Sequence, residues 1–109
     1  MTRKLFKKLD KRNTGYGYWK YYINRSYYYS GNIVSLYQAT QLYFAWREWC
    51  WQTWGGSKEL DSWLEDTRHL PNANTVGHNE HWCFQNNQFA TRIYLRGDKE
   101  LSTFLLRWL

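Results

Sequence analysis

Residues 35–56 read SLYQATQLYFAWREWCWQTWGG and predict the longest helix of the chain. Ser35, with Gln38 three residues later, is typical of a capping box, and the Gly55-Gly56 pair ends the pattern after Trp54. Apolar residues at helical spacing indicate a wide stripe that faces a protein core, with Thr53 at its margin. The stripe consists of Ala39, Leu42, Tyr43, Trp46, Trp49 and Cys50.

A second aromatic stripe recurs every seven residues along the same helix, at Tyr37, Phe44 and Trp51. An ordinary surface helix is polar on the side that turns away from the core. Two interpretations follow from this departure. Either the helix is sandwiched between two layers, or the rings form an exposed contact strip.

The residues before this helix favour extended structure. Residues 16–30 are mostly aromatic, β-branched or small, and Asn24-Arg25-Ser26 is a plausible turn between two short runs, residues 18–23 and 27–30. We expect a strand or a hairpin here. Alternation in the first run puts Trp19, Tyr21 and Ile23 on the core face and Tyr18, Lys20 and Tyr22 on the other.

The second half of the chain adds a hairpin and a second helix. Residues 81–85 and 89–95 predict two strands joined through Asn86-Asn87-Gln88. Asp98 then caps a C-terminal helix, whose core stripe consists of Leu101, Phe104, Leu105 and Trp108. Between the long helix and the hairpin, residues 58–64 predict an edge strand or a short helical turn. Residues 67–80, which contain Pro71, predict a surface loop.

This order of elements predicts an α+β fold, an antiparallel sheet with the long helix and the C-terminal helix packed on one face. A chain of 109 residues is the usual size of one domain. We assign residues 15–109 to a single domain and residues 1–14 to a basic N-terminal segment with a charge of +5. That segment predicts one or two amphipathic helical turns with Leu5, Phe6 and Leu9 on one side. It either frays and docks through Phe6 or becomes ordered on a partner.

The aromatic residues point to binding. Fifteen of the twenty-three lie between Tyr16 and Trp54, more ring surface than the interior of one small domain absorbs. Tyr and Trp concentrate at protein interfaces and where nucleobases stack. We therefore expect a non-enzymatic protein that binds another protein, with its basic segment steering association. The expected contact residues are Tyr16, Tyr18, Tyr22, Tyr27, Tyr28 and Tyr29, with Lys7, Lys8, Lys11 and Arg12.

Residues 14–21 read TGYGYWKY and support an alternative function. This motif resembles the RNA-contacting strand of RNA-recognition motifs and of cold-shock domains, although Thr14 stands where those families have a basic residue. The resemblance implies a protein that binds single-stranded RNA or DNA. In that case bases stack on Tyr16, Tyr18 and Tyr21, and phosphates meet Arg12, Lys20 and Arg25. The other interpretation of the same residues is core and edge packing.

No residue pattern predicts catalysis, a cofactor or a bound metal. His69, His78, His81 and Cys83 are candidate ligands, but their spacing is not that of a zinc finger or ribbon. Cys50 and Cys83 each adjoin tryptophan and predict buried thiols in a reducing compartment, the cytoplasm. No apolar run approaches the roughly 20 residues of a membrane span, so we expect no membrane partner.

Residues 92–108 read RIYLRGDKELSTFLLRW, a strand, an acidic cap and a helix that ends in Leu-Arg-Trp. This cassette resembles one found in small phage-encoded accessory proteins. The resemblance implies a viral protein without enzymatic activity, acting in the cytoplasm of an infected bacterium or in the virion. Such a protein is an inhibitor, an adaptor or a structural component. The oligomeric state stays open, because the aromatic strip of the long helix suits self-association as well as binding of a different protein.

Overall fold

The structure is a computed structural model that describes residues 5–29, 32–69 and 79–108. Its centre is a four-stranded antiparallel sheet in the order β1-β2-β6-β5. The strands are β1 (Phe6–Lys8), β2 (Tyr21–Asn24), β5 (Trp82–Asn86) and β6 (Thr91–Leu95). A separate two-stranded ribbon, β3 (Tyr28–Tyr29) with β4 (Asn32–Ile33), precedes the first helix.

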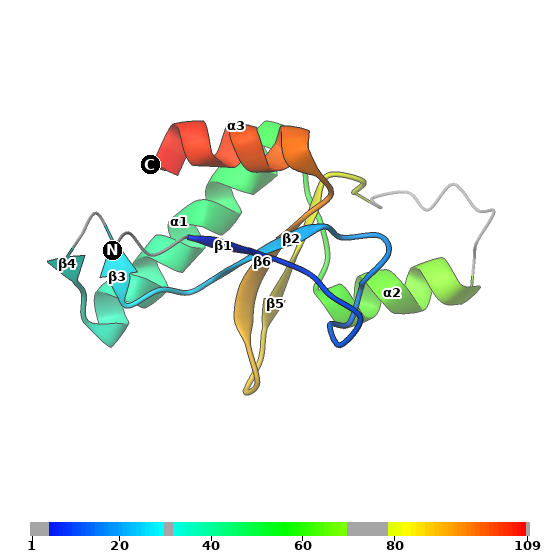
Figure 1. Ribbon diagram of the computed structural model, residues 1–109, viewed down its shortest axis with the longest axis horizontal. Helices are drawn as coiled ribbons and strands as arrows, with labels where there is room; N and C mark the ends of the chain where they lie inside the picture. Colours follow the sequence, from blue (N-terminus) through cyan, green and yellow to red (C-terminus); the bar gives the residue numbers. More distant parts are fainter. Residues whose placement is uncertain (1–4, 30–31, 70–78, 109) are drawn as a thin grey trace.

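Three helices surround the sheet: α1 (Leu36–Trp54), α2 (Leu60–His69) and α3 (Asp98–Trp108). Figure 1 shows α1 and α3 stacked beside the sheet and α2 at the opposite end of the molecule, while the β5–β6 hairpin extends away from all three. The predicted α+β class is confirmed, and so is the position of the long and the C-terminal helix. The predicted hairpin is confirmed as β5 and β6.

The capping box of α1 is present as its sequence predicts. The Ser35 hydroxyl oxygen accepts a hydrogen bond from the Gln38 backbone N–H at 3.1 Å, and Gln38 Oε1 accepts one from the Ser35 N–H at 2.9 Å. Gly55 ends the helix at φ 93°, a backbone conformation that favours glycine. Ala39, Tyr43, Trp46 and Cys50 are buried as predicted. Thr53 is exposed, so the core stripe ends before it.

One face of the sheet forms the main core with α1 and α3. Ile23, Ile93 and Leu95 point to this face because alternate residues of a strand share a side. They pack against Tyr43 and Trp46 of α1, and Leu101 and Phe104 of α3 complete the cluster. Trp46 and Phe104 meet edge to face, with ring centroids 5.8 Å apart. Ring packing therefore holds both helices on this face.

The opposite face has a second core, which we did not expect. Tyr22, Tyr94 and Cys83 point to this side and are covered by Trp19, Leu60 and Trp63. For residues 58–64 we predicted an edge strand or a short helical turn; the helical alternative is confirmed, but the helix begins at Leu60 and is longer than one turn, with ten residues. Leu60 and Trp63 lie one helical turn apart and are both buried. The helix also takes in residues 67–69 of the predicted loop, whereas residues 70–78, with Pro71, lie outside the described residues.

The N-terminal segment is corrected from helix to strand. Residues 6–8 form β1, an edge strand whose Lys7 lies opposite Tyr22 of β2. Below it, the Leu9 N–H donates to the Lys20 carbonyl oxygen at 2.9 Å, and Leu9 is buried. Three residues have too little intrinsic preference to decide their own conformation. Their strand conformation comes from pairing with the backbone N–H and C=O groups on the free edge of β2.

Residues 14–19 form turns with a bridge between Tyr16 and Trp19, so most of the nucleic-acid motif is not the strand that it implies, and only Tyr21 lies in β2. Gly15 and Gly17 adopt φ values of 91° and 99°, and the Trp19 N–H donates to the Gly15 carbonyl oxygen at 3.0 Å. The side chain of Trp19 is buried against Trp63 and fixes the turn. Of the strand or hairpin expected for residues 18–30, the strand is confirmed as β2, and the two runs do not pair with each other in the described residues. β2 pairs with β1 and β6, and β3 pairs with β4.

Candidate functional site

The outer face of α1 carries exposed rings. Tyr37, Phe44 and Trp51, the stripe that repeats every seven residues, are 73%, 43% and 50% exposed. The buried stripe on the other side of α1 packs the helix on the sheet, so that packing does not depend on these three rings. Of the two interpretations of the second stripe, the exposed strip is confirmed. We call these three side chains the α1 strip.

The α1 strip has a shallow hollow of about 510 Å³ between Phe44 and Trp51, with Arg47 and Glu48 on its two sides. These positions are i, i+3, i+4 and i+7 of one helix. Four residues at this spacing form the hole that receives a side chain of a second helix in knobs-into-holes packing. The hollow therefore has the geometry of a receptor for one apolar side chain.

The walls of this hollow are fixed by contacts within the fold. The Arg47 guanidinium lies 3.9 Å from the ring centroid of Phe84 and 5.6 Å from that of Phe44. Trp51 rests on Gly56, where an added Cβ would come within 2.8 Å of the indole ring. Rings that are already held lose little conformational freedom when a partner binds.

The tyrosines that we expected at a contact surface are scattered. Tyr16 and Tyr27 are 55% and 45% exposed, but they precede and follow β2 and so lie beyond its opposite ends. Tyr18 is half-buried, with its ring centroid 4.5 Å from that of Trp63 and 4.2 Å from the Arg96 guanidinium. Tyr22 is buried. Tyr28 and Tyr29 form β3.

The basic residues of the first segment are mostly free of the core. Lys7 and Lys8 are exposed on the edge strand β1, and Lys11 is exposed in the following turn. Arg12 forms a 2.8 Å ion pair with Asp10. These cations lie at the edge of the sheet, and their side chains are not part of the core.

Two residues of the alternative nucleic-acid set form hydrogen-bond and ion-pair contacts within the chain. The Tyr21 hydroxyl donates to Asp98 Oδ1 at 2.6 Å, and Lys20 Nζ lies 3.0 Å from the same oxygen. Together they lower the pKa of the Asp98 carboxyl, with the Tyr21 hydrogen bond as the larger cause. The contacts tie β2 to the start of α3. A third member, Arg25, donates to Thr40 Oγ1 at 3.4 Å and to the Tyr27 hydroxyl at 3.3 Å.

Arg92 is a candidate binding residue that the sequence reasoning missed. It lies on the α2 side of β6, where its Nε donates to Asn24 Oδ1 at 2.8 Å and its Nη1 to the Tyr94 hydroxyl at 3.3 Å. The guanidinium lies 4.3 Å from the ring centroid of Tyr22. Alternation along residues 92–96 already places Arg92 and Tyr94 on one face, which is the signal that could have identified it.

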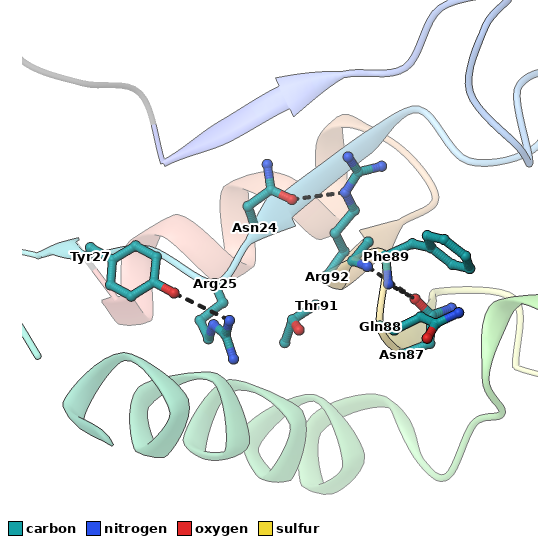
Figure 2. A pocket seen from close by; sticks show the side chains of 9 residues that line it. Asn24, Arg25, Tyr27, Asn87, Gln88, Phe89, Thr91 and Arg92 are labelled. Carbon is teal, nitrogen blue, oxygen red and sulfur yellow. Dashed lines mark hydrogen bonds between the residues drawn. The ribbon is translucent and has the colours of Figure 1, made fainter. Parts of the chain in front are cut away.

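A pocket of about 320 Å³ lies where the β5–β6 hairpin meets the end of β2. Its lining includes Arg25, Tyr27, Phe89 and Arg92 and contains no acidic residue. Figure 2 shows that Arg25 and Thr91 point toward α1, whereas the Arg92 guanidinium points away from it. The two guanidinium groups therefore serve opposite sides of the sheet and do not converge on one ligand.

The candidate metal ligands do not form a cluster in the part of the chain that the structure describes. His81 Nδ1 lies 2.9 Å from Glu100 Oε2, and Cys83 is buried in the second core. His78 lies outside the described residues. Burial raises the pKa of the Cys83 and Cys50 thiols, which disfavours the reactive thiolate.

Within the described residues, no helix is both long and apolar enough to cross a membrane. Comparison of the chain with protein-family models, with curated proteins and with solved structures gives no match.

Proposed function

We propose that this protein is not an enzyme and that it binds another protein through the α1 strip. The observation that carries the proposal is the exposure of Tyr37, Phe44 and Trp51 on one side of a helix whose other side is fully occupied by the core. Aromatic side chains dominate the energetics of protein interfaces, since they bury a large area at a small cost in conformational entropy.

The shape of the strip favours a helical partner. An apolar side chain of a second helix fits the hollow between Phe44 and Trp51, while Arg47 and Glu48 lie at its rim. Lys7, Lys8 and Lys11 add positive charge that speeds association with an acidic partner and makes it sensitive to salt. The resemblance of residues 92–108 makes a bacterial host protein or a phage protein the expected partner.

The test compares capture of bacterial proteins by the native chain and by the double variant Phe44→Ser, Trp51→Ser. Loss of two central rings should reduce a specifically captured protein at least about tenfold, since hot-spot truncations cost about 2 kcal/mol or more each. Phe89→Ser is the matched control, because Phe89 is 84% exposed on the hairpin turn, away from α1. Equal recovery by all three proteins would remove the α1 strip from the proposal.

Self-association is the second outcome of the same test. When the partner helix is the α1 of another copy, sedimentation of the native chain depends on its concentration and that of the double variant does not. The strip is a protein-binding surface only if the double variant loses binding, either of a captured protein or of a second copy of the chain. Circular dichroism of the variants checks that their helix content is native.

A further inference from the structure

The charge on the four sheet strands has one sign. Lys7, Lys8 and Arg92 lie on these strands, and no Asp or Glu does. Two carboxylates near the ends of the strands are already paired, Asp10 with Arg12 and Asp98 with Lys20, whereas Glu80 precedes β5 and Glu59 bridges to Phe84 at the edge of the sheet. Among the described residues, Lys7, Lys8 and Arg92 themselves form no ion pair, so their charge is available to a ligand.

Arg92 is held in place by neutral groups. Asn24 and Tyr94 accept its hydrogen bonds, Tyr22 lies under its guanidinium, and the Tyr94 hydroxyl in turn donates to Gln85 Oε1 at 2.8 Å. No carboxylate among the described residues lies within ion-pair distance of Arg92. An oriented guanidinium without a counterion is suited to binding a phosphate oxygen.

Lys7 lies on the same side of the sheet as Arg92. It stands directly opposite Tyr22 in the β1–β2 register, and residues opposite each other in an antiparallel pair point to the same face. Lys7 is exposed, and Arg92 packs on the same Tyr22 ring. Lys7 and Arg92 thus lie on one face of the sheet, Lys7 opposite Tyr22 in register and Arg92 over the Tyr22 ring.

Exposed rings lie at both ends of this basic face. Phe89 projects from the turn of the β5–β6 hairpin, which Figure 1 shows extending beyond the helices. Tyr16, more than half exposed, follows the turn that contains Arg12. Every nucleobase has a face that stacks on such rings, whereas the acidic side chains of a protein partner have none.

We infer that the α2-side face of the sheet binds single-stranded nucleic acid, with Arg92 and Lys7 contacting phosphates and Phe89 stacking on a base. The inference does not depend on the α1 strip, because the strip lies on the opposite side of the sheet; Lys7, which also adds charge that speeds association of the protein partner, is the residue that the two proposals share. It also differs from the motif-based alternative, since Lys20 and Tyr21 of that set are bound to Asp98. Single strands suit this face better than a duplex, because the rings need unpaired bases.

The test measures fluorescence anisotropy of labelled oligothymidylate and oligouridylate of about twenty nucleotides, a length that spans one small domain. We expect binding at low salt that weakens steeply as salt rises, because phosphate contacts release counterions. Lys7→Gln, an exposed substitution that leaves the core intact, should weaken binding about threefold, and Arg92→Gln about tenfold. Phe89→Ser should weaken it about fivefold through loss of stacking.

The control is Arg107→Gln, which removes the same charge from an exposed position of α3. Absence of binding at low salt overturns the inference. An equal loss for Arg107→Gln and Lys7→Gln overturns it too, since binding would then follow net charge alone. Displacement of the oligonucleotide by polyglutamate at an equal concentration of charge would assign the face to acidic proteins, again against the inference.

Discussion

At the scale of single residues, Asn79 does the most to join distant parts of the chain. Its Nδ2 shares two hydrogens among the carbonyl oxygens of Trp54, Gly55 and Gly56, at 2.8, 3.2 and 3.2 Å. Its Oδ1 accepts from the backbone N–H groups of residues 81 and 82. The side chain therefore satisfies the end of α1 and the start of β5 together, in a buried position.

Replacing Asn79 should destabilise the fold strongly, although its side chain is small. Asn79→Ala leaves buried backbone donors and acceptors without partners, so the free energy of unfolding should fall by about 2–3 kcal/mol. Urea unfolding followed by tryptophan fluorescence measures the change. Asn87→Ala is the control, since Asn87 makes its bonds in an exposed turn, and its cost should stay below about 1 kcal/mol. Equal costs at the two positions would contradict the role given to Asn79.

The sequence could not have singled out Asn79. It lies in a polar segment for which a surface loop is the natural prediction, and all hydrogen-bond partners of its side chain are backbone groups. Backbone groups carry no sequence signal. Arg92 differs in this respect, because strand alternation alone placed it beside Tyr94, and only the absence of a carboxylate partner needed the structure.

Among the helices and strands, local sequence signals predicted those elements correctly whose conformation is determined by their own residues. The capping box at Ser35 and Gln38 set the start of α1, and the hairpin residues set the β5–β6 connection. β1 was mistaken for helix because its strand conformation comes from pairing with β2. α2 was underestimated, although Leu60, Trp63 and Leu64 already stand at helical spacing, because the pattern is short.

The start of α1 offers a test at this scale. Ser35→Ala removes the side-chain acceptor for the Gln38 N–H, so the free energy of unfolding should fall by about 1 kcal/mol. Ser35→Asp keeps an acceptor at the same position and should stay within a few tenths of a kcal/mol of the native chain. Ser102→Ala, exposed inside α3, is a control that should cost nothing, because alanine favours helix. Denaturant unfolding of all three variants decides whether the cap contributes as its geometry indicates.

At the scale of the whole molecule, the aromatic residues divide between two cores and the surface. Trp19, Trp46, Trp63 and Trp82 are among the largest fully buried side chains, on both faces of one sheet. We expected one covered face, so the fold absorbs more rings than the sequence led us to expect. The position of α2 determines which rings stay exposed. That position is set by tertiary contacts, which the sequence pattern does not show. The expected tyrosine surface was therefore scattered, whereas the α1 strip, defined by helical period alone, stayed together.

The two proposed surfaces should act independently, because the sheet and its two cores separate them. Phe44→Ser with Trp51→Ser should abolish capture of the protein partner and leave oligonucleotide affinity within about twofold, since distant sites without shared partners are additive. Phe89→Ser should weaken oligonucleotide binding about fivefold and leave capture of the protein partner unchanged. Anisotropy and quantitative capture on the same preparations measure both properties. If the α1 double variant also lost nucleic-acid binding while keeping its helix content, the two surfaces would be one, and the division of this molecule by the sheet would have to be abandoned.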